Sequence, residues 1–145
     1  MDKPIPNELV GILNDIKRHE GFRSTVYQCT EGYDTIGYWF AVKDLVLDKG
    51  IADLILMKKH HKLLERILIA FPWFKDIDDK AKSVVVNMCY QLGLSGFSKF
   101  KKTIYLLETE QYEDASIEML DSLWAKQTPS RAKELSEALR AVPTD

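Results

Sequence analysis

The chain has 145 residues, of which 46% are hydrophobic and 29% are charged, a composition typical of one globular domain that buries a core without disulfides. The formal net charge of −2 argues against a dedicated nucleic-acid binder, because such proteins present a strongly positive surface to phosphates. No run of about 18 apolar residues exists, so we predict no stable membrane insertion. Two cysteines, Cys29 and Cys89, are too few for a disulfide framework, and we expect both to be reduced.

The first predicted element is a helix over residues 7–20. Pro6 and Asn7 supply its start, and apolar residues recur at helical spacing on one face: Leu9, Ile12, Leu13 and Ile16. Gly21 ends the helix. Glu20 extends the apolar stripe, and because a carboxylate at the end of an apolar face is unusual, we expect it to be partly buried in a cleft.

Residues 22–42 are predicted to form a β hairpin. Residue pairs of β type stand at 26–27 and 35–36, and Gly32 between them suits the turn. Residues 39–42 are predicted to add a third short strand.

Helical patterns fill the rest of the chain. The spacing of apolar residues predicts a helix over 52–70 that Pro72 closes. It also predicts a helix over 79–92 that Gly93 and Gly96 break.

Three more helices are predicted towards the C-terminus. Two occupy residues 98–108 and 111–124. The last begins at Thr128 as N-cap, with Pro129 at its first position. It is expected to turn four apolar residues inward: Ala132, Leu135, Leu139 and Val142.

The order of these elements predicts an α+β fold, with a small β lobe inserted after the first helix beside a larger helical lobe. The predicted β lobe covers residues 22–50. Residues 1–21 and 71–145 form the predicted helical lobe. A connecting helix over 51–70 joins the two lobes within a single domain.

The segment of residues 19–38 reads HEGFRSTVYQCTEGYDTIGY. In it Glu20, Cys29 and Thr35 follow the spacing of a Glu, eight residues, an Asp or Cys, five residues and a Thr. This segment resembles the active-site segment of the phage-type lysozymes (endolysins), the T-even phage lysozyme family of glycoside hydrolases. The resemblance implies a lysozyme-like fold in which these three residues are catalytic.

Two further blocks extend the resemblance over most of the chain. Residues 87–97 look like the family's helix that lines the cleft from the helical lobe. Residues 124–132 are similar to its entry into the last helix. The family's arginine at the position of Arg131 pairs with the catalytic glutamate, which implies an Arg131–Glu20 ion pair here.

Four residues are the predicted substrate contacts. Asn87 and Gln91 lie one helical turn apart, so both amides can hydrogen-bond sugar hydroxyls or N-acetyl groups. Without the resemblance they could equally be solvated amides on a helix surface. Tyr38 and Phe97, within the matching blocks, complete the set.

Glu20 is the predicted general acid. Glycosidic cleavage requires a carboxylic acid that is still protonated near neutral pH, so that it can give its proton to the leaving oxygen. Taken alone, a glutamate at a helix end could as well be paired with a basic neighbour. The surrounding family motif favours the catalytic assignment.

Cys29 has two open interpretations. An unperturbed thiol, with a pKa of about 8.5, is mostly neutral at pH 7 and makes a poor base. Cys29 could therefore simply pack. Alternatively, Cys29 and Thr35 hold and polarise the attacking water, since the family tolerates cysteine here. The resemblance implies inversion, with water attacking the face opposite the acid.

The chain departs from the family pattern after Tyr38. Many members continue with Gly-His, whereas this chain has Trp39 and Phe40. Either the cleft floor is aromatic here and suited to stacking a sugar ring, or the substrate binds in another register.

Other patterns favour structural roles. His60 and His61 could suggest a metal, but no further ligands stand at helical spacing and lysines flank them, so we predict a solvated helix face and no metal. Residues 97–102 mix aromatic and basic side chains. They are expected on a helix surface, with contact to an anionic wall as the alternative. Cys89 is predicted to be a core thiol.

The predicted function is that of an endolysin, a muramidase that hydrolyses the β-1,4 bond between N-acetylmuramic acid and N-acetylglucosamine in peptidoglycan, without metal or cofactor. The N-terminus lacks the apolar core of a signal peptide, so we expect a monomer in the host cytoplasm that a partner holin releases to the wall for host cell lysis. Glycan strands of peptidoglycan are the expected partner. The alternatives are a catalytically silent glycan-binding or interaction protein, a chitin-active enzyme, and a transglycosylase.

Overall fold

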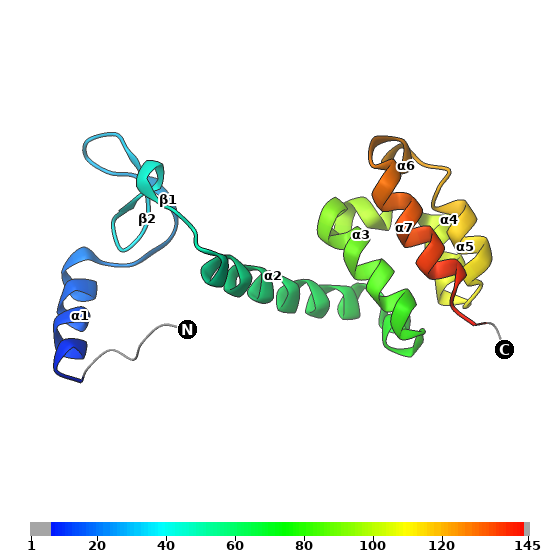
Figure 1. The fold of residues 1–145 in the computed structure, drawn as a ribbon, viewed down its shortest axis with the longest axis horizontal. Coiled ribbons are helices and arrows are strands. Elements are labelled where there is room, and N and C mark those ends of the chain that lie inside the picture. The colour runs from blue at the N-terminus through cyan, green and yellow to red at the C-terminus, as the bar shows by residue number, and fades with distance from the viewer. Residues whose placement is uncertain (1–6, 144–145) are drawn as a thin grey trace. The chain divides into compact units, whose positions relative to one another are not determined.

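The computed structural model describes residues 7–143, except for the side chains of Asn7 and Glu8, and has the predicted α+β organisation (Figure 1). A helix is followed by a three-stranded sheet and then by helices alone. The chain divides into two units, residues 1–51 and 52–145. This division groups the first helix with the strands, and its predicted membership of the helical lobe stays a prediction.

Helix α1 (Asn7–Glu20) has the predicted bounds, although Pro6 of its predicted start lies outside the described residues. Gly21 ends the helix with a φ of 71°, and its amide donates to the Lys17 carbonyl oxygen at 3.0 Å. Glycine adopts this left-handed conformation without steric cost. Within its unit the predicted apolar face is largely open to solvent, with Leu9, Ile12 and Ile16 all exposed.

The three strands form one antiparallel sheet in the order β1-β2-β3. They are β1 (Arg23–Gln28), β2 (Asp34–Gly37) and β3 (Phe40–Ala41). Tyr27 pairs with Thr35 across the first two strands. The predicted hairpin and third strand are therefore confirmed, although residue 42 begins a short 3-10 helix, η1 (Val42–Asp44), instead of continuing β3.

Helix α2 (Lys49–Ala70) is 22 residues long, which corresponds to about 33 Å. It starts three residues before the predicted position because the side chain of Asp48 accepts the amide proton of Ile51 at 2.9 Å and so caps the helix. Its end at Ala70, two residues before Pro72, agrees with the prediction.

The remaining elements belong to the second unit. The short 3-10 helix η2 (Pro72–Asp76) precedes five α-helices: α3 (Asp79–Ser98), α4 (Lys101–Glu108), α5 (Tyr112–Glu118), α6 (Leu123–Gln127) and α7 (Pro129–Arg140). Helix α7 packs against α3, α5 and α6. As predicted, its residues Ala132, Leu135 and Leu139 are buried.

Three helix boundaries predicted in the second unit are wrong. The helix predicted over 98–108 begins at Lys101, since residue 98 still belongs to α3. Gly93 leaves the helical conformation as expected, but the helix resumes beyond it and Gly96 does not break it. The single helix predicted over 111–124 is divided into α5 and α6. The division arises because the hydroxyl of Ser122 accepts the amide proton of Ala125 and caps a new helix.

The hydrophobic core lies in the second unit. Every buried hydrophobic side chain among the described residues falls between Leu63 and Val142, whereas Thr35 is the single buried side chain described in the first unit. A unit with three short strands and one helix is too small to enclose an apolar core of its own. None of the helices within residues 7–143 combines the length and the apolar character that crossing a membrane requires.

Candidate active site

The turn between β1 and β2 brings two of the three predicted catalytic residues together. The Cys29 amide donates to the Tyr33 carbonyl oxygen at 2.9 Å, which closes the turn directly after β1. Thr35 pairs with Tyr27, and side chains two residues apart on a strand share a face. Cys29 and Thr35 therefore stand as diagonal neighbours on one face of the hairpin.

Hydrogen bonds to sulfur lower the pKa of the Cys29 thiol below its ordinary value. The backbone of Tyr33 has the largest effect, followed by the backbone of Glu31, and the hydroxyl of Thr35 acts in the same direction. Each donor stabilises the thiolate over the neutral thiol. Partial desolvation and the carboxylate of Glu31 oppose this effect without reversing it.

The hydroxyl of Thr35 is held in place from its own strand. It is almost fully buried, at 2% exposure, and its oxygen lies 3.1 Å from the carbonyl oxygen of Tyr33, to which it donates. A hydroxyl has one proton and two acceptor lone pairs. It can therefore donate to Tyr33 while Cys29 is a thiol and turn towards the sulfur when Cys29 ionises.

Glu20 is the last residue of α1, where the helix dipole is negative. Its side chain is exposed, and within the described residues it has no hydrogen bond or ion pair. The partial burial expected for this carboxylate is not found within the first unit, and burial in a cleft stays a prediction. Its predicted ion pair with Arg131, a residue of the second unit, stays a prediction.

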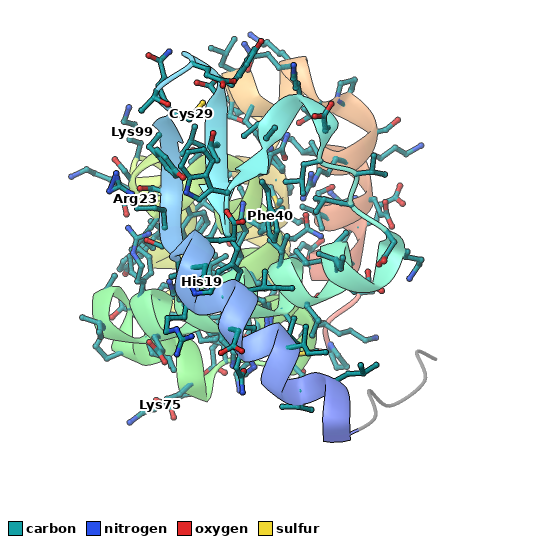
Figure 2. All side chains as sticks on the ribbon, turned by 90° about the vertical axis from the view of Figure 1, so that its left-hand side faces the viewer. His19, Arg23, Cys29, Phe40, Lys75 and Lys99 are labelled. Carbon is teal, nitrogen blue, oxygen red and sulfur yellow. The ribbon has the colours of Figure 1, made fainter. Side chains whose placement is uncertain are left out.

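Aromatic side chains gather on the sheet. The partly buried ring of Tyr38 packs against Phe22 and Phe40, at centroid distances of 5.4 and 6.3 Å. The ring of Trp39 meets that of Tyr27 edge to face at 6.5 Å. Figure 2 shows Phe40 and Arg23 on the strands, with Cys29 beyond the end of β1.

The backbone of Trp39 is unusual. Its φ of 62° places a bulky residue in the left-handed region. Among the described non-glycine residues, Glu110 is the only other one with a positive φ. Such a residue carries strain of order 1–3 kcal/mol. Gly37 in the same turn has a φ of 71°, and a Cβ there would lie 2.8 Å from the Phe40 ring, so a larger residue would be strained and would displace that ring.

In the second unit, the two predicted amide residues are each held by a partner. The Nε of Arg131 donates to Oδ1 of Asn87 at 2.8 Å, and the indole Nε1 of Trp124 donates to Oε1 of Gln91 at 2.9 Å. Each amide oxygen therefore already accepts one hydrogen bond, and the NH2 groups are available as donors. The role of Trp124 could not be predicted from the sequence, because its partner is 33 residues away and no local pattern connects them.

A cavity of about 800 Å³ opens beside the Asn87–Arg131 pair. Apolar side chains of α2 and α3 form much of its wall, and Tyr90 and His60 also line it. The cavity is large enough for a small-molecule or sugar ligand.

Phe97 does not fit its predicted role as a substrate contact. Its side chain has no exposed surface and packs against the rings of Phe71 and Phe100, at 5.8 and 6.3 Å. It follows the kink at Gly93, and the helix that resumes there turns it into the core. We therefore assign Phe97 to the core.

Cys89, His60 and His61 are the remaining residues considered in the sequence for a reactive or metal-binding role. Cys89 is a free thiol in the core, as predicted, and burial raises its pKa to about 12. The rings of His60 and His61 lie 6.3 Å apart on the exposed side of α2. Across residues 7–143, three or more metal-ligating side chains are nowhere grouped together.

The chain matches known proteins over most of its length. Residues 17–140 match the sequence model of the family described as Phage lysozyme. Two relatives come from Dictyostelium discoideum: "Probable T4-type lysozyme 2", at 37% identity over 62 residues, and "Probable T4-type lysozyme 1", at 24% identity over 157 aligned positions. A third is "Pre-baseplate central spike protein Gp5" of Enterobacteria phage T4, at 29% identity over 158 aligned positions.

These relatives differ in how much of each chain is matched. The first match covers 43% of this chain and 36% of its relative, and the second covers 88% and 92%. The match to Gp5 covers 90% of this chain but 28% of that protein. This chain therefore spans nearly the whole of one relative and about a third of the other two. The family match includes all three predicted catalytic positions and Asn87, Gln91 and Arg131.

Proposed function

Because the chain belongs to the phage lysozyme family and is thus a glycoside hydrolase, we propose that it is a muramidase. In this proposal it cleaves the β-1,4 bond between N-acetylmuramic acid and N-acetylglucosamine. It serves host cell lysis after release through a holin. The observation that carries the proposal is the family match over residues 17–140, which contains Glu20, Cys29 and Thr35 at the family's spacing. Peptidoglycan is the substrate that this family membership implies.

Glu20 is the proposed general acid. It gives its proton to the glycosidic oxygen as the bond from that oxygen to the anomeric carbon breaks. Its place supports this role, since its side chain is exposed at the end of α1. An acid that donates its proton to the substrate has to be accessible to it.

Cys29 and Thr35 are the proposed water-binding pair. The lowered pKa of Cys29 makes the thiolate available at lower pH than in an ordinary cysteine. The thiolate takes a proton from water while the water oxygen bonds to the anomeric carbon on the face opposite Glu20. The products are a reducing end of inverted configuration and a free hydroxyl on the leaving sugar.

Asn87 and Gln91 are the proposed substrate contacts in the second unit. Their oxygens already accept protons from Arg131 and Trp124, so their NH2 groups are the parts left to bind a ligand. We therefore assign them to acceptor groups of the substrate, such as an N-acetyl carbonyl oxygen. The oxygen of a sugar hydroxyl could accept from these NH2 groups in the same way.

The test is the release of reducing ends from purified peptidoglycan by the wild type and by Glu20→Gln. The amide keeps the shape of the side chain but cannot supply the proton, so we expect a loss of at least about 10²-fold with the fold unchanged. Wild-type protein that binds glycan without cleaving it would identify a silent lysozyme-like protein instead. Products with anhydro ends and no gain of reducing ends would identify a transglycosylase.

A further inference from the structure

We propose that Trp39 is a sugar-stacking platform, on which the indole ring covers the face of one pyranose unit of the glycan and so sets how tightly substrate binds. The inference rests on the proposed function, since it names how that site holds its glycan. It concerns the position where the chain has tryptophan in place of the family's glycine.

The backbone of Trp39 gives the first argument. Its φ of 62° is a conformation that glycine or asparagine adopts far more readily than tryptophan. Strained residues persist where the surrounding structure or the function requires them. The core does not require this one, because the side chain is 50% exposed on the surface of the first unit.

The position of the ring relative to the water-binding pair gives the second argument. The indole of Trp39 contacts the ring of Tyr27, and Tyr27 pairs directly with Thr35 across the sheet. Cross-strand partners share a sheet face. Trp39 therefore contacts the cross-strand neighbour of Thr35, on the sheet face where Thr35 neighbours Cys29.

The indole is also held in a fixed orientation. Its ring plane is nearly perpendicular to that of Tyr27, at 82°. The guanidinium of Arg23 lies over the Tyr27 ring, 4.5 Å from its centroid. The guanidinium over the Tyr27 ring and the edge contact of that ring with the indole restrict the orientation of Trp39, which reduces the entropy that a ligand would otherwise have to remove.

The chemistry of the ring defines the ligand. A β-1,4-linked pyranose with equatorial substituents presents its C–H bonds on the two ring faces. An indole offers the largest apolar surface of any side chain, with a negative face that attracts polarised C–H groups. The contact involves no proton transfer, so it contributes to substrate binding rather than to bond cleavage.

The test compares three substitutions on soluble peptidoglycan fragments. Trp39→Gly and Trp39→Asn remove the ring and relieve the strain, whereas Trp39→Phe keeps both a ring and the strain. For Gly and Asn we expect KM to rise about tenfold with kcat within about threefold of wild type, and for Phe we expect KM to stay within about threefold. The midpoint of thermal unfolding should not fall in Trp39→Gly. An unchanged KM in both ring-free variants would overturn the proposal.

A binding measurement separates this inference from the muramidase proposal. Intrinsic fluorescence of the Glu20→Gln protein is titrated with the same fragments, and the response should become clearly smaller when Trp39→Phe is added. Any remainder is assigned to Trp124, which is hydrogen-bonded to the proposed substrate contact Gln91. Trp73→Phe is the matched control, because Trp73 packs against Phe71 at 5.5 Å and should leave the response intact. If the wild-type protein releases no reducing ends but the Trp39 response to the fragments is still seen, the muramidase proposal is refuted and the platform proposal is retained. A response independent of Trp39 would refute the platform alone.

Discussion

The hydroxyl of Thr35 stabilises the thiolate of Cys29 from a diagonal position on the same hairpin face. The backbone of Tyr33 ties the two together, since its carbonyl oxygen accepts both the Cys29 amide proton and the Thr35 hydroxyl proton. When Cys29 ionises, the Thr35 hydroxyl turns from this carbonyl oxygen to the sulfur, and the backbones of Tyr33 and Glu31 stabilise the thiolate in the same direction. The buried Thr35 and the partly buried Cys29 are thus coupled, and a substitution at Thr35 should change the ionisation of the Cys29 thiol.

Removing the Thr35 hydroxyl should raise the pKa of Cys29. In Thr35→Val the thiolate loses one stabilising contact, so at neutral pH a smaller fraction of Cys29 is ionised and alkylation slows. The measurement is the rate of thiol alkylation against pH. Thr35→Ser keeps the hydroxyl and should retain the wild-type profile. Cys89 gives no background, since its pKa is raised to about 12 by burial. Identical profiles for wild type and Thr35→Val would show that the hydroxyl does not reach the sulfur.

Substitutions of Cys29 separate water positioning from packing. Cys29→Asp should keep substantial activity, because a carboxylate also orients water and accepts a proton. Cys29→Ala should lose about 10²-fold or more in kcat, the scale of lost general-base assistance. Cys29→Ser should lie between them, because the hydroxyl holds water but polarises it less. Initial rates of glycan hydrolysis decide the order, and a folded Cys29→Ala protein as fast as wild type would leave the thiol with packing alone.

Arg131 and Asn87 should be energetically coupled. The guanidinium donates to Oδ1 of Asn87 at 2.8 Å, and a second nitrogen lies 3.4 Å from its backbone carbonyl oxygen. In a double-mutant cycle of Arg131→Ala and Asn87→Ala, urea unfolding should give a coupling free energy of about 0.5–2 kcal/mol. Both single variants should also raise KM, since each releases the amide from its fixed orientation. Additive unfolding free energies would show that the bond contributes nothing.

Two isoleucines on α2 should differ sharply in their contribution to stability. Ile67 is fully buried in the core of the second unit, whereas Ile69 is 82% exposed. Ile67→Ala should lower the free energy of unfolding by about 2–5 kcal/mol, since it removes buried methyl groups and leaves a cavity. Ile69→Ala, the matched control on the same helix, should change it by no more than about 0.5 kcal/mol. Similar losses in the two variants would mean that Ile69 is covered in solution.

Local sequence signals determined much of this protein. The bounds of α1, the hairpin turn and the end of α2 follow from residues only a few positions apart, because helix periodicity, glycine stops and proline breaks act within one or two turns. The spacing of Glu20, Cys29 and Thr35, on which their proposed catalytic roles rest, could likewise be read from the chain alone, since it lies within a single short segment.

Only the tertiary structure decided which partners those residues meet. Asn87 and Arg131 are 44 residues apart, and Gln91 and Trp124 are 33 apart, so no local pattern could show that each amide oxygen already accepts one hydrogen bond. The same holds for Phe97, whose local pattern suits a surface as well as a core until the kink at Gly93 turns it inward. Burial and hydrogen-bond partners depend on elements distant in sequence, and these meet only when the chain has folded.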